Sequence, residues 1–474
     1  MPSCWGPSIE AKRVSAVSPT RRFCLQPPMS TDRQASLKLT FLIIGGGLSG
    51  LACAYVLRNA GHDVVIFEQN SGRVKSGFAA FFKTEGSIRA PPNMTRLLSR
   101  WPGMAQLFQT HGTRCSGISF RSGETSKPVS CIKFHEEIMS DLEADFFNIQ
   151  HAKAVDISKL PDGTVSVVLE DGSGMRGDIV VGADGRNSFV RSFVIEEDTE
   201  PAHIVTGANI AISTKLLNED PELHSLCEGN QVGVFAARSL ERGGLTVQFS
   251  SLFGWGTTQA SPESSIDTLN LGLCAPLELD GSLDGDWYER YPPSILRFDL
   301  SGYDERLQKL IQLGHSCHPT VHKVFEQTDM VGVDSTVVLV GDAAHPVLIH
   351  GSHNSSMGIE DAVTLGSLFS HLASRKQIPI FLETYEELRQ ARTSATQASE
   401  YQSLVQISLP RGEQQEARDE ALRCTLSQEF DDFDNCSGSD LLVQAWEEYL
   451  VLFSYDARDE VDNWWSKWKF TMGK

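Results

Sequence analysis

A glycine-rich turn between a short apolar strand and a helix constrains the fold of this chain more than any other feature. The turn is Gly45–Gly50, with the sequence Gly-Gly-Gly-Leu-Ser-Gly, and residues 39–44 before it have the apolar composition of a buried strand. Residues 48–60 have helical periodicity, Gly61 ends the helix, and residues 64–67 form the next strand. A strand, a helix and a second strand so close together predict a right-handed βαβ unit, and therefore an α/β protein with a parallel sheet.

The glycines of this turn have distinct physical purposes. Gly45 permits the tight bend, Gly47 lets the backbone approach a pyrophosphate, and Gly50 lets the helix pack closely on the strand. The helix N-terminus offers N–H groups and a partial positive charge to phosphates. Glu68 ends the second strand, where a carboxylate can accept hydrogen bonds from ribose hydroxyls and repels a 2′-phosphate. A chance glycine-rich turn is the alternative, but the elements in register favour a dinucleotide site.

A second glycine corner, far downstream, narrows the ligand to FAD. Gly341-Asp342-Ala343-Ala344-His345-Pro346 follows the apolar residues 336–340 and precedes a predicted amphipathic helix at 359–374. The carboxylate of Asp342, at the C-terminal edge of a strand, can accept hydrogen bonds from the ribityl chain. The helix directs its N-terminal dipole towards the flavin, where reduction builds negative charge. Gly-Asp alone indicates only a turn, but with Ile359-Glu360-Asp361-Ala362 it indicates an FAD site.

The composition is that of a globular protein that does not bind nucleic acids. The chain has 474 residues, of which 41% are hydrophobic and 22% charged, which suggests two domains. Its net charge of −20 repels phosphate backbones. The most apolar window, 41–57, is interrupted by four glycines, so no run resembles a transmembrane helix. The ten cysteines have no Cys-x-x-Cys spacing, so we expect a reducing compartment, the cytoplasm, and no metal site.

The chain divides into four predicted regions. Residues 1–37 are weakly similar to a mitochondrial presequence, but their prolines favour a disordered N-terminal extension. Residues 38–202 and 330–400 form a discontinuous Rossmann-like FAD-binding domain. Residues 203–329 form an inserted substrate domain with a mixed or antiparallel β-sheet, because strands follow one another there without intervening helices. Residues 401–474 form a helical C-terminal region.

Hydrophobic periodicity predicts the individual elements of these regions. The strands expected after the βαβ unit are 164–169, with a hairpin turn at Asp171-Gly172, then 179–181, 204–212, 231–235, 245–249, 269–274 and 336–340. The helices expected after it are 93–110, 303–313, 359–374, 381–402, 413–426 and 441–468.

Three fingerprints together resemble those of a known family. They are Gly45–Gly50, Ala183-Asp184-Gly185 with Arg186, and Gly341-Asp342. The chain is similar to class A FAD-dependent aromatic hydroxylases, above all to the salicylate hydroxylase-like monooxygenases. Weaker matches extend the resemblance over residues 39–468. They are Pro91-Pro92-Asn93 with Arg96-Leu97-Leu98, residues 411–415 with 417–419, and Ser454-Tyr455-Asp456-Ala457.

The resemblance implies a set of cofactor-binding residues. Gly45, Gly47, Gly50 and Glu68 would hold the ADP half of FAD, Asp184 would lie near the pyrophosphate, Asp342 would hold the ribityl chain, Ser355 would contact the flavin, and Gly86 would lie in the flavin-edge segment. No catalytic residue is identified by a motif.

The resemblance also implies a reaction. NAD(P)H reduces FAD, O₂ reacts with the reduced flavin, and one oxygen atom passes to an electron-rich ring while water is excluded. The substrate would be an aromatic, phenolic small molecule of secondary metabolism or aromatic catabolism. A phenol reacts faster as phenolate, so a base near its hydroxyl helps. His350 and His353 are the candidates for this base, and a solvent-facing loop histidine is the alternative for each.

The chain departs from the family pattern at several places. Two glycines of the flavin loop are replaced by Ser352 and Asn354, residues 76–84 look inserted, and an Arg expected near His135 is missing. Two interpretations remain open: a divergent enzyme with an altered pocket, or a flavin-binding protein with impaired activity. A non-oxygenating FAD oxidoreductase on the same fold is a further alternative.

Overall fold

The computed structural model describes the chain from Arg33 to Met472 with gaps. The described residues are 33–69, 90–101, 103–104, 106, 108, 117–133, 149–195, 203–213, 215–216, 219–224, 226, 231–236, 247–250, 268–274, 291–296, 302–325, 329–332, 334–346, 351, 353–409, 411–427, 448 and 451–472. The chain divides into two compact units, Met1–Asp32 and Arg33–Lys474, and every described residue belongs to the second. The extension expected at 1–37 therefore lies almost entirely outside the described residues.

A five-stranded parallel sheet confirms the predicted βαβ unit and the α/β fold class. Its strands, in spatial order, are β15 (Val337–Leu339), β9 (Ile179–Gly182), β1 (Thr40–Ile44), β2 (Asp63–Glu68) and β5 (Ile149–His151), and all neighbours are parallel. Ile44 and Leu339 both pair with Gly182. The C-terminal ends of β1, β9 and β15 therefore lie at one edge, which is where open α/β sheets bind ligands.

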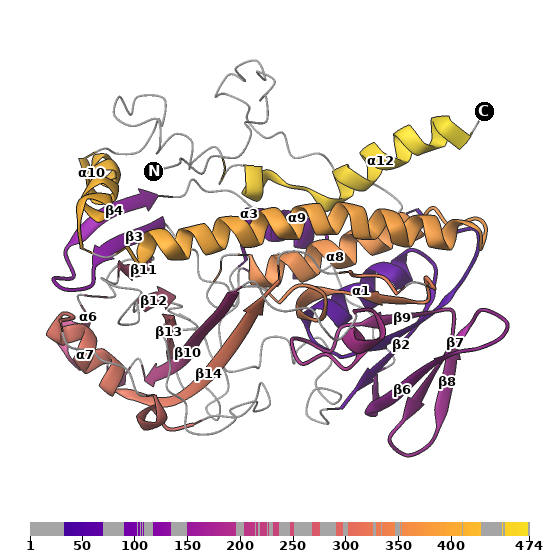
Figure 1. Ribbon diagram of the computed structural model, residues 1–474, viewed down its shortest axis with the longest axis horizontal. Helices are drawn as coiled ribbons and strands as arrows, with labels where there is room; N and C mark the ends of the chain where they lie inside the picture. Colours follow the sequence, from indigo (N-terminus) through magenta and orange to yellow (C-terminus); the bar gives the residue numbers. More distant parts are fainter. Residues whose placement is uncertain are drawn as a thin grey trace, which may run out of the picture. The chain divides into compact units, whose positions relative to one another are not determined.

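A layer of helices packs on this sheet. Its members are α1 (Leu48–Asn59), α3 (Pro92–Leu98), α8 (Asn354–Phe369), α9 (Gln377–Ile407) and α12 (Ala457–Met472), and α8 contacts all the others (Figure 1). Gly366 permits the close approach of α1 and α8, since a Cβ there would lie 2.7 Å from the Val56 side chain.

Helix α8 differs from the amphipathic helix expected at 359–374. It begins at Asn354, ends at Phe369, and is buried on every face from Ser356 to Gly366. The expectation failed because α8 is surrounded by other helices, so its polar face meets protein rather than water.

A seven-stranded sheet forms the second core. Its strands, in spatial order, are β14 (Gly314–Val324), β10 (His203–Ser213), β13 (Thr268–Cys274), β12 (Val247–Ser250), β11 (Gln231–Ala236), β3 (Gly117–Ser122) and β4 (Pro128–Lys133). Only β11 and β3 pair in parallel among these described strands, so the sheet is mixed, as predicted. Ile210 and Leu271 of this sheet pack with Leu307 and Leu310 of α7 (Glu305–Gln312).

The sheet takes β3 and β4 from the part of the chain that the sequence groups with the FAD-binding domain. The boundaries of the four predicted regions remain predictions. A third, antiparallel sheet contains β6 (Ala154–Lys159), β7 (Val165–Leu169) and β8 (Gly174–Gly177), with the expected hairpin turn at Asp171-Gly172 between the last two. The remaining short elements are α6 (Pro221–His224) and the 3₁₀ turns η2 (Val190–Phe193), η3 (Pro293–Ile295) and η4 (Gly341–Ala343).

Two expected helices are interrupted within their predicted ranges. The helix expected at 93–110 is interrupted after Leu98, three residues before the Trp101-Pro102 step, which disfavours helical backbone, and the described residues 104, 106 and 108 are helical again. The helix expected at 441–468 is interrupted at Tyr455–Asp456, and α12 begins afresh at Ala457. The interruption has a polar cause, because Arg96 donates to the carbonyls of Phe453, Ser454 and Tyr455. In the described part of the chain, no helix has the length and apolar character to cross a membrane.

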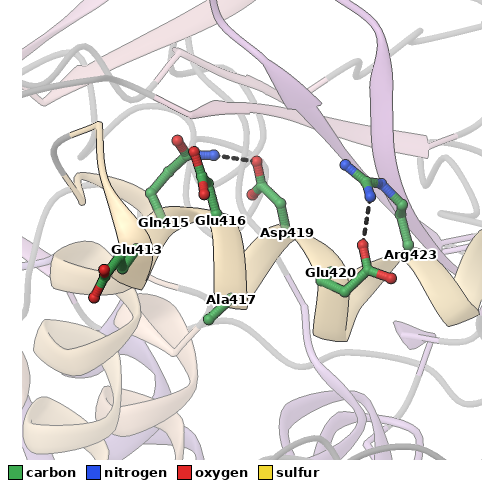
Figure 2. A pocket seen from close by; sticks show the side chains of 7 residues that line it. All are labelled: Glu413, Gln415, Glu416, Ala417, Asp419, Glu420 and Arg423. Atoms are coloured by element: carbon green, nitrogen blue, oxygen red, sulfur yellow. Dashed lines mark hydrogen bonds and ion pairs between the residues drawn. The ribbon is translucent and has the colours of Figure 1, made fainter.

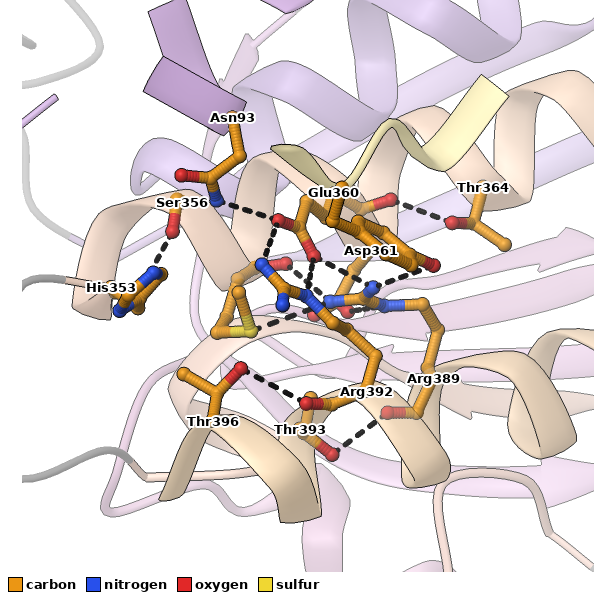
Figure 3. A network of polar contacts seen from close by, with 12 residues as sticks. Asn93, His353, Ser356, Glu360, Asp361, Thr364, Arg389, Arg392, Thr393 and Thr396 are labelled. Atoms are coloured by element: carbon orange, nitrogen blue, oxygen red, sulfur yellow. Dashed lines mark hydrogen bonds and ion pairs between the residues drawn. The ribbon is translucent and has the colours of Figure 1, made fainter. Parts of the chain in front are cut away.

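A buried ionic network joins the helices of this layer (Figure 3). Glu360 of α8 accepts hydrogen bonds from Asn93 of α3 at 2.7 Å and from Arg389 and Arg392 of α9 at 2.9 and 3.0 Å. Asp361 accepts from Arg389 Nε at 2.6 Å. Both carboxylates and Arg389 are fully buried. Burial opposes charge on Arg389, but Asp361 and Glu360 raise the pKa of its guanidinium well above its ordinary value.

Replacing Arg389 with Met is expected to destabilise the fold strongly. The variant leaves the buried Asp361 without its guanidinium partner and Glu360 with Arg392 alone, which costs about 3 to 5 kcal/mol of unfolding free energy. The control is Lys153→Ala, which removes an exposed ion pair with Glu170 and should cost less than about 1 kcal/mol. Denaturant titration measures the unfolding free energy of both variants. Equal losses would contradict a stabilising role of the ionic network.

The unfolding free energy is expected to increase with pH between about 4 and 6.5. Burial, and then the charge of Arg33, lower the pKa of His371 from 6.5 to about 4, and its ring stacks on Trp465 at 3.9 Å. The unfolded chain therefore binds a proton in this window that the folded chain does not, and stability is lost as the pH falls. In His371→Gln the unfolding free energy should depend less steeply on pH. An unchanged pH dependence, or an equal decrease in the exposed control His315→Gln, would contradict the assignment of this effect to His371.

Candidate active site

The first glycine corner has two positions, Gly45 and Gly50, at which no residue larger than glycine fits. Gly45 has φ of +105°, and a Cβ on it would lie 2.3 Å from the carbonyl oxygen of Ala183. A Cβ on Gly50 would lie 2.0 Å from the carbonyl oxygen of Gly45. Gly47 forms the N-cap of α1, which has no side-chain cap and no acidic residue in its first turn. The first N–H groups of α1 are therefore not paired with a capping side chain or with an acidic side chain of the first turn.

Glu68 lies beside this corner, where the sequence predicted it. Its side chain is buried, and Oε2 accepts a hydrogen bond from the Gly46 N–H at 2.7 Å. The carboxylate therefore fixes the turn itself, in addition to the ribose contact that remains a prediction.

The second glycine corner contacts the first. Gly341 has φ of +61°, and a Cβ on it would lie 2.2 Å from Ser49 Oγ. A Cβ on Gly358 of α8 would lie 2.1 Å from the same oxygen. Ser49, within the first corner, thus lies between Gly341 and Gly358. The fold brings together the two motifs that the sequence analysis paired.

The buried carboxylate of Asp361, which belongs to the motif Ile359-Glu360-Asp361-Ala362, fixes the second corner. Asp361 Oδ2 accepts from the Gly341 N–H at 2.7 Å and lies 2.6 Å from His345 Nε2. Burial alone would raise the pKa of Asp361, but His345 and Arg389 lower it to about 2. The carboxylate is therefore ionised at neutral pH. A carboxylate within a helix of polar and apolar residues gives no sequence signal that it reaches back to a turn twenty residues earlier.

Asp342 lies half-buried next to this arrangement. Burial raises the pKa of its carboxyl group and Asp361 adds to the effect, while the charges of His345 and Arg186 oppose it. Arg186, which follows the second fingerprint, has Nη2 3.3 Å from His318 Nε2 of β14. The charges around Asp342 therefore come from Asp361 of α8, His345 and Arg186, and Arg186 in turn contacts β14.

Asp184 has a defined partner set in this structure. Its Oδ1 accepts from Ser188 Oγ at 2.5 Å and its Oδ2 from the Val190 N–H at 3.1 Å, so it holds the start of η2. Burial raises the pKa of its carboxyl group. Arg191 of η2 donates to the carbonyls of Ala343 and Ala344, at 2.9 and 3.2 Å, which connects the second fingerprint to the Gly-Asp corner. The place of Asp184 near a pyrophosphate remains a prediction.

The flavin loop is described in part. Ser355 lies half-buried in the first turn of α8, and Asn354 is the first residue of that helix, so Asn354 does not adopt the left-handed backbone that a glycine would permit. Gly86, His135, His350, Ser352 and the segment 76–84 lie outside the described residues.

A surface hollow lies on α10 (Glu413–Ser427), and none of its lining residues belongs to the glycine corners. Figure 2 shows its lining, which comes from this single helix: Glu413, Gln415, Glu416, Ala417, Asp419, Glu420 and Arg423. The described residues include no group of three or more His, Cys, Asp or Glu side chains placed to hold a metal ion.

Comparison with known proteins adds sequence relatives. A family model for NAD(P)-binding Rossmann-like domains matches residues 43–88. The chain is 24% identical over 436 residues to the FAD-dependent monooxygenase atnJ of Arthrinium sp, covering 86% of this chain and 92% of that protein. It is 26% identical to hispidin-3-hydroxylase of Neonothopanus nambi, with 77% and 88% covered, and 25% identical to 3-amino-4-hydroxybenzoate 2-monooxygenase PtmB3 of Streptomyces platensis, with 82% and 93% covered.

Solved structures share the fold. FqzB aligns with a TM-score of 0.63 and 17% identity, covering 93% of this chain and 95% of that chain. Salicylate hydroxylase in its substrate complex aligns with a TM-score of 0.59 and 18% identity, covering 90% and 97%. The Rossmann-like match, the named monooxygenase relatives and the shared fold together make the chain similar to class A flavoprotein hydroxylases.

Proposed function

We propose that this chain is an FAD-dependent monooxygenase that hydroxylates an aromatic, phenolic small molecule with NAD(P)H and O₂, in secondary metabolism or aromatic catabolism. The contact of the two glycine corners carries the proposal, because Ser49 lies against both Gly341 and Gly358. Relatives named as FAD-dependent monooxygenases and as hydroxylases of aromatic compounds support it. We also propose the cytoplasm as its location, from the cysteine spacing.

The first corner fits the ADP half of FAD. The N-terminus of α1 has neither a capping side chain nor an acidic residue in its first turn, so it can accept a pyrophosphate. The backbone of Gly45, Gly47 and Gly50 presents no Cβ to an approaching phosphate. Glu68, buried at the end of β2, adds a carboxylate that suits ribose hydroxyls and repels a 2′-phosphate.

The second corner fits the ribityl chain. Asp342 offers a half-buried carboxylate, and the buried Nδ1 of the nearby His345 has no hydrogen-bond partner among the described residues. A polyol suits both atoms, because each hydroxyl group can donate and accept hydrogen bonds. Asp361 and Arg389 hold the corner rigid, which orients Asp342.

When bound, FAD supplies electron transfer from NAD(P)H and transfer of one oxygen atom from O₂. The chain's own residues supply binding and orientation: Gly45, Gly47 and Gly50 with Asp184 for the ADP half, and Asp342 for the ribityl chain. Ser355 and Gly86 would contact the flavin, and the substrate domain 203–329 would enclose the aromatic ring and exclude water.

Replacing Asp342 with Asn is expected to weaken FAD binding about tenfold, because the change removes charge-assisted hydrogen bonds and keeps the shape. Fluorescence titration of the apoprotein measures the dissociation constant. The control Asp156→Asn changes an exposed carboxylate of β6 and should bind FAD like the wild type. Equal affinities for both variants would contradict the ribityl role of Asp342.

The reaction itself is tested with the purified wild-type protein. We expect bound flavin, its reduction by NAD(P)H accelerated by a phenolic acid, and a hydroxylated product by mass spectrometry. Reduction without an oxygenated product would instead identify a non-oxygenating oxidoreductase. A folded protein that takes up no FAD would reject the proposal and identify a protein with impaired activity.

A further inference from the structure

A histidine and a glutamate form a buried pair at the N-terminus of α8. The His353 side chain is 2% exposed, and its Nδ1 lies 3.2 Å from Glu400 Oε1 of α9. The backbone N–H of His353 donates to the same oxygen at 2.8 Å. The imidazole stacks on Phe453, with ring centroids 5.0 Å apart. Figure 3 shows His353 at the start of α8, ahead of the residues of the ionic network.

The hydrogen bond fixes which nitrogen of His353 is free. An ionised carboxylate only accepts hydrogen bonds, so Nδ1 carries the hydrogen, and in the neutral imidazole the lone pair is then on Nε2. Nε2 is buried and has no hydrogen-bond partner among the described residues. A carboxylate that orients a histidine through one nitrogen and leaves the other bare is the arrangement of a general base.

Two further acceptor oxygens at this pair have no hydrogen-bond partner in the part of the chain that the structure describes. They are Glu400 Oε2 and Asn354 Oδ1, both buried. A Cβ on Gly351 would lie 2.1 Å from the first oxygen and 2.6 Å from the second, so both flank the same glycine. Acceptors without a donor suit a ligand that brings one, such as a hydroxyl group. Ser355, assigned to the flavin in the proposed function, is two residues from His353.

We propose that His353, positioned by Glu400, accepts the proton of the aromatic substrate's hydroxyl group; this inference rests on the proposed function. The substrate O–H bond breaks, its proton forms a bond to His353 Nε2, and the electron pair remains on the phenolate oxygen. The Glu400 carboxylate stabilises the imidazolium, and the phenolate makes the ring more electron-rich for oxygen transfer. In the described residues around the imidazole, α9 contributes the charge of Glu400, and the C-terminal segment contributes the uncharged Phe453.

The test compares His353→Gln and Glu400→Gln with the exposed control His315→Gln. In His353→Gln, kcat at neutral pH should fall about 100-fold, with bound FAD and KM nearly unchanged. Its rate should increase with pH as the free phenol ionises, and phenols of lower pKa should restore it. Glu400→Gln should give a smaller fall. A wild-type pH profile in His353→Gln would overturn the inference, whereas loss of FAD binding by the wild type would overturn the proposed function instead.

A second measurement needs no variant. A nitrophenol, whose phenolate is coloured, is bound to the FAD-loaded wild-type protein at a pH below the pKa of the free phenol. We expect the bound molecule to absorb as phenolate, because the imidazole removes its proton. Binding with the spectrum of the neutral phenol would overturn the inference.

Discussion

The buried carboxylate of Asp361 supports the architecture on which the candidate site depends. It accepts from the Gly341 N–H, contacts His345 and is paired with Arg389, all within 2.7 Å. A buried charge is tolerated only where partners and hydrogen bonds compensate its desolvation. The same partners that keep Asp361 ionised therefore also fix the backbone of the Gly-Asp corner.

This interaction explains why α8 is buried on every face. The helix must lie close to α1, so that Ser49 fits between Gly341 and Gly358, and close to α9, so that Arg389 reaches Asp361 and Glu360. Gly358 and Gly366 allow α8 to lie close to α1. The ionic network compensates the desolvation of the polar groups that are buried where α8 packs on α9. Packing and electrostatics therefore position the same corner of the sheet.

The N-terminus of α8 combines these features with the proposed chemistry. Its departures from the family pattern, Ser352 and Asn354, flank His353, whose orientation depends on Glu400 of the neighbouring helix. Asn354 has helical backbone there. At this position the departure from the family pattern therefore does not strain the backbone.

The parallel sheet, the first glycine corner and most strands could be predicted because they depend on local patterns. Gly45 and Gly50 stand where only glycine fits, and apolar runs such as residues 39–44 indicate buried strands directly. The α8 boundaries and the break at Tyr455–Asp456 could not be predicted, since helix neighbours and the Arg96 guanidinium cause them. Asp361 was identified only as a member of a motif, and Arg389 and Glu400 were not identified as site residues, because a charged residue in a helix usually indicates a solvated face.

The sequence by itself determined that two glycine corners exist, that each follows a strand, and which fold class carries them. Only the tertiary structure decided that Ser49 lies against Gly341, that Asp361 reaches back to the turn, and that Glu400 orients His353. The physical reason is the range of the interactions. Backbone conformation and strand burial depend on neighbouring residues, whereas the partners of a buried charge come from segments far apart in the chain.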